Sequence, residues 1–234
     1  MSKTLLQVCK KLTAGLGFPP DFGRLAKFEF QIFWVRWRCR LSPGQIRALR
    51  RLRKGKDWRI HFGCGDKPLE GWINVDGVPN PRADLFLDLR RPLPLATGSA
   101  DCIFSDHVIE HLRDEEAERF FRECYRILKP GGAIRVVTPD LEKFARAYLA
   151  DDRDFFRRAS PEAPEPVSAL NLLFRRSGHH NYIFDYGELE RFLRRAGFPN
   201  VHRSSFGHSA RPGMNLDCSD DQRRAESLYV EASK

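Results

Sequence analysis

The stretch Trp58-Arg59-Ile60-His61-Phe62-Gly63-Cys64-Gly65-Asp66 decides the fold, because a short β-like run leads directly into a glycine turn. Glycines at the end of a strand allow backbone N–H groups to approach a ligand closely. A second β-like run, residues 72 to 75, ends at Asp76, whose carboxylate can accept hydrogen bonds from a ribose diol. Together the two strand endings predict a nucleotide-binding edge.

β-like and helical patterns alternate along the rest of the chain. Further short apolar runs lie at residues 83 to 87, 101 to 105 and 133 to 137. Between the last two runs, apolar residues recur with helical spacing from 114 to 128, and Lys129-Pro130-Gly131-Gly132 ends that helix. This alternation predicts an α/β fold with a parallel sheet covered by helices on both faces. Ligands of such sheets bind at the carboxyl ends of the strands.

Positive charge is concentrated at the N-terminus. The chain of 234 residues has a net charge of +9, but residues 1 to 60 hold 15 Lys and Arg against 3 acids. The remaining residues are net negative. The basic segment also contains several aromatic residues, and residues 45 to 54 are typical of a short basic helix after a Ser-Pro-Gly turn. We therefore expect a basic, aromatic helical extension at 1-57 and the main domain at 58-234.

Three interpretations of the extension stay open: helices that pack on the main domain, binding to an anionic membrane surface, and binding to nucleic acid. The first residues lack the apolar run of a secretory signal, and no stretch approaches the ~18 apolar residues of a membrane span. Six cysteines without a Cys-x-x-Cys pair indicate reduced thiols. We expect a cytoplasmic protein, with peripheral membrane contact through residues 1-57 left open.

A nicotinamide dinucleotide is the obvious competing ligand, and the glycine turn does not fit it. The dinucleotide fingerprint requires a third glycine where this chain has Pro68. It places its acidic residue about 20 positions after the first glycine, whereas Asp76 lies 13 positions after Gly63. Residues 66 to 71 are too few for a long helix that faces a pyrophosphate. An oxidoreductase is therefore set aside.

Five segments carry a more specific pattern. They are His61-Phe62-Gly63-Cys64-Gly65-Asp66, Gly71-Trp72-Ile73-Asn74-Val75-Asp76, Leu87-Asp88-Leu89, Asp106-His107-Val108-Ile109-Glu110-His111-Leu112 and Arg126-Ile127-Leu128-Lys129-Pro130-Gly131-Gly132. In this order they resemble the class I S-adenosylmethionine-dependent methyltransferases, in particular a type 11-like group of small predicted bacterial methyltransferases. The resemblance implies a Rossmann-like, seven-stranded, mostly parallel sheet. Its last two strands, expected at 201 to 206 and 227 to 232, would form an antiparallel pair.

The resemblance also implies S-adenosyl-L-methionine as the cofactor, with its contacts at four strand endings. The glycine loop would lie along the methionyl part, and the acid after the second strand would hold the ribose hydroxyls. The ending of the third strand would meet the adenine, and that of the fourth would face the methionine amino group and the methyl. The expected cofactor-binding residues are Gly63, Cys64, Gly65, Asp76, Asp88, Leu89, Ser105 and Asp106.

Methyl transfer from a sulfonium requires alignment of donor and acceptor, with a base where the acceptor is a hydroxyl or amine. Asp106 and His107 are one pair of catalytic candidates. His179 and His180, within Gly178-His179-His180-Asn181-Tyr182, are the other, and we expect this segment to overhang the carboxyl end of the fifth strand. Two solvated surface histidines are the alternative interpretation of the second pair.

His107, Glu110 and His111 raise the question of a metal. On a helix these positions share one face, and the order His-x-x-Glu-His matches an inverted zinc-protease motif. We set a metallohydrolase aside because the motif lies within a methyltransferase-like chain. Relatives that act on catechols or RNA ends bind a divalent cation through Glu-x-x-Glu-His, but here His107 replaces the first Glu. We therefore expect no metal, and structural roles for Glu110 and His111.

The resulting hypothesis is a methyltransferase that acts on a small molecule or a saccharide. One alternative is a methyltransferase-like scaffold or binding protein with weak catalysis, because fold does not fix function. The intact Gly63, Gly65, Asp76 and Asp88 favour an active enzyme. The other alternative is a nucleic-acid methyltransferase, which only the basic N-terminus suggests. The net acidic main body has no recognised nucleic-acid-binding module, so nucleic acid is not the expected partner.

Overall fold

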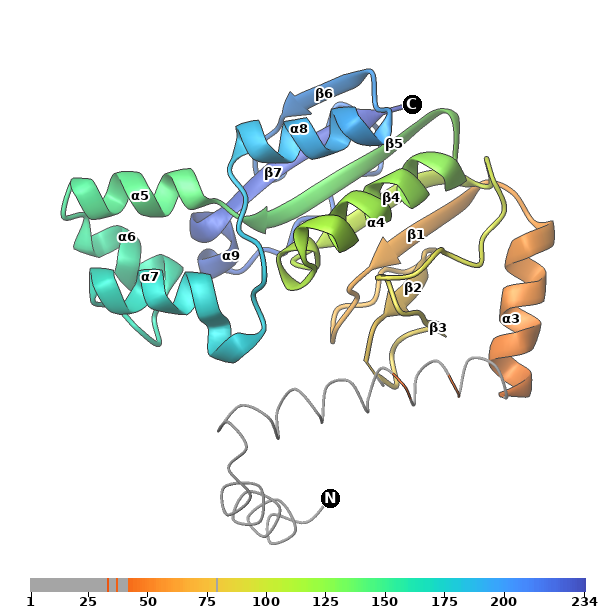
Figure 1. Cartoon of the computed structure of the whole chain (residues 1–234), viewed down its shortest axis with the longest axis horizontal. Coiled ribbons are helices and arrows are strands. Elements are labelled where there is room, and N and C mark those ends of the chain that lie inside the picture. The colour runs from red at the N-terminus through yellow and green to blue at the C-terminus, as the bar shows by residue number, and fades with distance from the viewer. Residues whose placement is uncertain (1–32, 34–36, 38–41, 79) are drawn as a thin grey trace, which may run out of the picture.

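The computed structural model describes residues 33, 37, 42–78 and 80–234, and a seven-stranded sheet lies at its centre (Figure 1). The strands are β1 (Trp58–Phe62), β2 (Ile73–Asp76), β3 (Leu85–Phe86), β4 (Ala100–Asp106), β5 (Leu128–Pro139), β6 (Asn200–Arg203) and β7 (Ser227–Ser233). Their order is β3-β2-β1-β4-β5-β7-β6. The first five are parallel, and β7 is antiparallel to β5 and β6. This confirms the predicted sheet, although β6 ends at Arg203 rather than at 206.

Helices connect many of the strands in the described chain. They are α3 (Pro43–Lys54), α4 (Asp114–Ile127), α5 (Leu141–Leu149), α6 (Arg153–Ala159), α7 (Pro166–Arg175), α8 (Tyr186–Ala196) and α9 (Asp221–Glu226), with short 3₁₀ turns η1 (Ile109–His111) and η2 (Arg176–Gly178). The Asp185 side chain caps α8 by accepting from Glu188 N at 2.8 Å, and Gly197, with φ at 112°, ends it. No helix in the described ranges has the length and apolar character needed to cross a membrane.

The segment between α4 and the main part of β5 differs from the sequence prediction. The helix ends at Ile127, as expected, but β5 begins at once with Leu128 and continues to Pro139. Leu128 pairs with Ala100, and the register then shifts before Cys102 pairs with Ala133. The four residues Lys129-Pro130-Gly131-Gly132 therefore form an irregularity within the strand rather than a loop before it.

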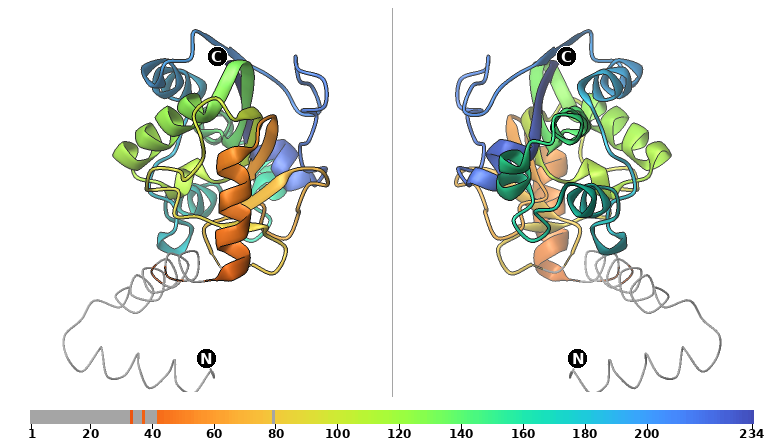
Figure 2. Two further views of the ribbon diagram at one scale, coloured as in Figure 1. Left: turned by 90° about the vertical axis from the view of Figure 1, so that its right-hand side faces the viewer. Right: turned by 90° about the vertical axis from the view of Figure 1, so that its left-hand side faces the viewer.

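One face of the sheet carries the main apolar core, and α3, α4 and α8 cover it (Figure 2). Ile60, Ile103 and Ile134, which lie on three adjacent strands, are fully buried in it. Phe120 and Phe121 of α4 pack there as well. Burial of an aliphatic or aromatic side chain contributes about 1.5 to 3 kcal/mol, so this face supplies most of the hydrophobic stabilisation.

The other face has a smaller core, covered partly by loops. Buried Trp72 and Met214 and half-buried Leu216 come from loops that pack on it. Arg135 of β5 is fully buried on this side and is paired with Asp217 (Nε to Oδ1, 2.8 Å) and Glu231 (Nη1 to Oε1, 2.7 Å). The arginine thereby fixes the long loop before α9 against the sheet.

Helices α5, α6 and α7 pack together in a cluster of their own, beyond the carboxyl end of β5 (Figure 1). α3 confirms the expected basic helix, and its Leu52 joins the main core. Phe33 and Trp37 are helical and exposed. The rest of the predicted extension 1-57 before residue 42 lies outside the described residues.

Candidate functional site

The loop after β1 is the first feature at the carboxyl edge of the sheet. Gly63 has φ at 76°, and the N–H groups of Gly63 and Cys64 both donate to Val75 O, at 2.9 and 3.2 Å. A Cβ added to Gly63 would overlap the Val108 side chain and lie 3.3 Å from Asp106 O. Glycine is therefore required for this loop to pass the end of β4.

Asp76, the last residue of β2, points its carboxylate at the glycine loop. It is 8% exposed, and it accepts hydrogen bonds from Gly65 N (3.1 Å), Val78 N (3.1 Å) and Asn80 Nδ2 (3.2 Å). Burial, together with nearby carboxylates, raises the pKa of the Cys64 thiol to about 12, so the thiol stays protonated. The predicted turn and the predicted acid thus lie side by side.

Asp88 and Leu89 follow β3 at the same edge, and both are buried. Asp88 Oδ1 accepts from the backbone N (3.2 Å) and the Nε (2.9 Å) of Arg90. The preceding Leu87 N donates to Asp76 O at 3.0 Å, which holds this loop against the end of β2. The loop that carries Asp88, the acid expected near the adenine, is therefore held beside Asp76, the acid expected near the ribose.

Ser105 and Asp106 end β4 next to the glycine loop. Ser105 is fully buried, and neither its Oγ nor Asp106 Oδ1 has a hydrogen-bond partner among the described residues. Burial raises the pKa of Asp106, while Arg223, 3.9 Å away, acts in the opposite direction. Buried polar atoms without partners are rare because each costs about 1 to 3 kcal/mol. Two of them at one strand ending indicate a place for a polar ligand.

His107 does not share a helical face with Glu110 and His111, and the sequence-based prediction of such a face was wrong. Only Ile109–His111 form a short 3₁₀ turn, and His107 precedes it with φ at 51°. Its Nδ1 lies 3.2 Å from Glu110 Oε1 and its Nε2 lies 2.9 Å from Ser227 Oγ. Both ring nitrogens of this catalytic candidate therefore have neighbours within the protein.

The second predicted cluster lies beside this turn. Asn181 N donates to Glu110 O at 2.7 Å, and the His111 and His180 rings pack edge to face with centroids 5.1 Å apart. His179 is exposed, and its carbonyl accepts from His111 Nδ1 at 2.9 Å. Burial lowers the pKa of half-buried His180, so its imidazole is neutral at pH 7.

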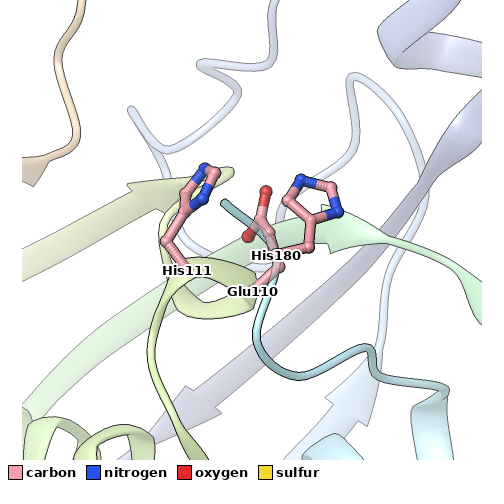
Figure 3. A group of neighbouring side chains, drawn as sticks. All are labelled: Glu110, His111 and His180. Carbon is pink, nitrogen blue, oxygen red and sulfur yellow. The ribbon is translucent and has the colours of Figure 1, made fainter. Parts of the chain in front are cut away.

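Two residues beyond the segment, the chain reaches the end of β5. Phe184 forms a parallel bridge with Asp140, and its carbonyl accepts from Leu141 N at 3.0 Å. Glu110, His111 and His180 place one donor atom each within 4.8 Å of one another (Figure 3). In the described part of the chain, the group with the geometry to bind a metal ion contains His180 in place of His107.

Glu226 is a site residue that the sequence analysis did not identify. It is 7% exposed and directly precedes β7, whose first residue, Ser227, pairs with Pro139 at the end of β5. Burial raises its pKa to about 7, Arg223 opposes the rise, and Glu110 adds to it. The antiparallel direction of β7 brings its start to the carboxyl edge of the parallel strands. No local pattern marks this glutamate, because only the pairing of β5 with β7 places it there.

Comparison with known proteins adds an independent observation. Residues 82–136 match the model of a family described as "Methyltransferase domain". A probable S-adenosylmethionine-dependent methyltransferase of Mycolicibacterium smegmatis is 40% identical over 65 residues, which are 28% of this chain and 24% of that protein. A second probable S-adenosylmethionine-dependent methyltransferase, of Mycobacterium tuberculosis, is 38% identical over 131 residues, 56% of this chain and 38% of that protein.

The chain thus spans less than two fifths of the length of these curated relatives. Among solved structures, a SAM-dependent methyltransferase of Thermotoga maritima, described as a possible histamine N-methyltransferase, is similar with a TM-score of 0.48 and 21% identity. That similarity covers 88% of this chain and 97% of the other.

Proposed function

We propose that this chain, which belongs to the class I S-adenosylmethionine-dependent methyltransferases, uses S-adenosyl-L-methionine to methylate a small-molecule or saccharide acceptor. The observation that carries the proposal is a pair of buried atoms at the end of β4, Ser105 Oγ and Asp106 Oδ1, which have no hydrogen-bond partner among the described residues. They lie beside a loop that only glycine can form. A ligand with a cationic amino group would satisfy Asp106 Oδ1.

The other residues of this edge fit the same cofactor. Asp76 accepts three hydrogen bonds from nitrogen donors and a longer one from the Cys64 thiol at 3.9 Å. Asn80 Nδ2 also donates to Gly65 O, so ribose hydroxyls can take its place at Asp76 while Gly65 N and Val78 N keep the carboxylate oriented. Buried Asp88 and Leu89 next to Asp76 suit an adenine that follows the ribose.

When bound, S-adenosyl-L-methionine supplies a methyl group on a sulfonium, which transfers by in-line displacement to a nucleophilic acceptor. The residues of this chain align the acceptor and remove its proton. Asp106, Asp140 and Glu226 are carboxylates with raised pKa at this edge, and Asp140 is already paired with Arg203 at 2.8 Å. Because the pKa of Glu226 is about 7, it can accept a proton from a hydroxyl or amine near neutral pH. His179 and His180 line the acceptor side in this proposal.

The charge distribution supports a small-molecule or saccharide acceptor over a nucleic acid. Residues 61 to 234 are net negative, so this part of the chain does not favour a polyanion. We place the protein in the cytoplasm, because the four cysteines in the described part of the chain are free thiols. Peripheral membrane contact through the basic segment 1-57 is part of the proposal, supported by clustered cations with exposed Trp37.

Transfer of a labelled methyl group tests the proposal. The full chain is incubated with S-adenosyl-L-methionine tritiated in the methyl, and with three separate pools: saccharides, small phenols and amines, and mixed RNA. We expect label in one of the first two pools. Label in RNA alone would contradict the acceptor class. Cofactor binding without transfer to any pool would favour the scaffold alternative.

A further inference from the structure

Glu110, His111 and His180 converge from two segments far apart in the sequence, with donor atoms within 4.8 Å of one another (Figure 3). We propose that they bind a divalent first-row transition metal ion, with Zn²⁺ and Co²⁺ as the probes. Two imidazoles and one carboxylate are ligands that such ions accept. The proposal goes beyond methyl transfer and does not depend on it.

The hydrogen bonds of both histidines leave the correct nitrogen available. His111 Nδ1 lies 2.9 Å from His179 O, and His180 Nδ1 lies 2.6 Å from Leu173 O. A carbonyl oxygen only accepts, so each Nδ1 carries the proton and each Nε2 keeps a lone pair. Metal-binding histidines typically donate their second ring N–H to a carbonyl or carboxylate in this way. One such hydrogen bond is common. The same bond on two neighbouring imidazoles indicates that both rings are oriented to bind a metal ion.

Glu110 supplies the negative charge. The residue is fully buried, and its Oε2 accepts from Thr138 Oγ1 at 3.2 Å. Its Oε1 has His107 Nδ1 at 3.2 Å but no hydrogen bond of acceptable geometry among the described residues. A buried carboxylate that is only partly compensated is costly, and a cation bound at this oxygen would remove that cost.

The backbone holds the two segments together before any ion binds. Asn181 N donates to Glu110 O at 2.7 Å, and Asn181 Nδ2 donates to His111 O at 2.7 Å. The ligands on the 3₁₀ turn and on the loop after η2 therefore have a fixed spacing. Ligand side chains that are held in place by supporting hydrogen bonds distinguish a metal site from a chance cluster.

The number of ligands suggests what the ion could do. His107 is engaged with Ser227 and Glu110, so it orients the carboxylate and is not a ligand. Three protein ligands leave at least one coordination position open, as in catalytic metal sites. Such a position would take an oxygen or nitrogen ligand, such as a hydroxyl group of a bound molecule.

Metal titration of the full chain, stripped with a chelator, tests this proposal. We expect one equivalent of Zn²⁺ by calorimetry, and visible d–d bands with Co²⁺ that Zn²⁺ displaces. Glu110→Gln keeps the shape and the Thr138 contact, and His180→Ala removes one imidazole. Each should weaken Zn²⁺ binding by ~100-fold. His202→Ala is the matched control, because this exposed histidine lies on β6, outside the three-ligand group, and it should leave the affinity unchanged.

Two results would overturn the assignment. One is the absence of stoichiometric Zn²⁺ binding to the wild-type chain. The other is binding that Glu110→Gln leaves unchanged while thermal unfolding shows that the variant is folded, since the ion would then sit elsewhere. Binding of S-adenosylhomocysteine to the metal-free chain is measured in parallel, so that failure of the metal site and failure of the methyltransferase proposal are distinguished.

Discussion

The carboxyl edge of the sheet has two halves that are built differently. The cofactor half comprises the glycine loop at residues 63 to 65 together with Asp76, Asp88, Ser105 and Asp106. The histidine half comprises Glu110, His111, His180 and Glu226. In the cofactor half, short loops after adjacent strands are tied together by backbone hydrogen bonds. In the histidine half, partners such as His111 and His179 lie 68 positions apart in the sequence.

This difference teaches which part of the site a sequence encodes locally. In the cofactor half, each residue type is required by its own strand ending, so the pattern is visible along the chain. In the histidine half, single polar residues acquire a role only when η1, the loop after η2 and the start of β7 meet. We expect substitutions at Gly63 or Asp76 to act separately from substitutions at His180, because additivity holds for sites without shared partners. Asp106 and Glu226 both interact with Arg223, so substitutions at these two carboxylates should be coupled.

The largest effect is expected from Gly63→Ala. The left-handed φ costs about 1 to 2 kcal/mol for a non-glycine residue, and overlap with Val108 adds about 1 to 3 kcal/mol. We expect a loss of roughly 3 to 4 kcal/mol in chemical denaturation. Gly71→Ala is the matched control, because its φ of 74° is the same but a Cβ there meets nothing within 4 Å. Equal losses in both variants would remove the close-approach argument.

Glu226→Gln should change how stability depends on pH. The pKa of Glu226 in the folded chain, about 7, lies above the 4.5 of an ordinary glutamate, so burial of the charged form destabilises the wild type progressively as pH rises from 4.5 to 7. The variant should therefore gain about 3 kcal/mol relative to wild type at pH 8 and little at pH 4. Denaturant titrations at both pH values measure this. A difference independent of pH would contradict the raised pKa.

Asp76→Asn should weaken S-adenosylhomocysteine binding by ~30-fold, about 2 kcal/mol, because a hydrogen bond to a charged group contributes about 1.5 to 3 kcal/mol. Asp84→Asn is the control. Asp84 also accepts at this side of the sheet, from Asn74 N at 2.8 Å, but it lies outside the proposed cofactor contacts. Calorimetric titration of both variants checks the prediction, and similar losses would mean that the ribose contact is misplaced.

The smallest effect on stability is expected from His180→Ala in metal-free protein. It removes one hydrogen bond to Leu173 O and the ring contact with His111, about 1 kcal/mol in total. Affinity for S-adenosylhomocysteine should not change, whereas methyl transfer should fall because the acceptor side is altered. A loss of cofactor affinity would show that the two halves are coupled.

Local sequence accounts for most of the fold and for the cofactor half. The strand endings at Gly63, Asp76 and Asp106 lie at one edge, as the alternating pattern predicts, and β7 is antiparallel as expected. Loops rather than helices cover much of the second face, because Arg135 fixes a distant segment through Asp217. That contact spans 82 positions and has no periodic signal.

The histidine half shows why the remainder could not be predicted. The spacing of His107, Glu110 and His111 suggested a helical face, but a left-handed φ at His107 turns the chain and sends its ring to Ser227. His180, rather than His107, lies close to Glu110 and His111. Glu226 reaches the edge only through the pairing of β7 with β5. Tertiary contacts determine where these side chains lie, and a single amino-acid sequence does not reveal such contacts.

Calorimetric titration of the full chain with S-adenosyl-L-methionine and S-adenosylhomocysteine tests the central claim most directly, with NADH as the control ligand. We predict one site per chain, with dissociation constants in the micromolar range for both compounds and no heat from NADH. Absence of binding by a folded chain, or tighter binding of NADH, would contradict the assignment of the carboxyl edge as an S-adenosylmethionine site.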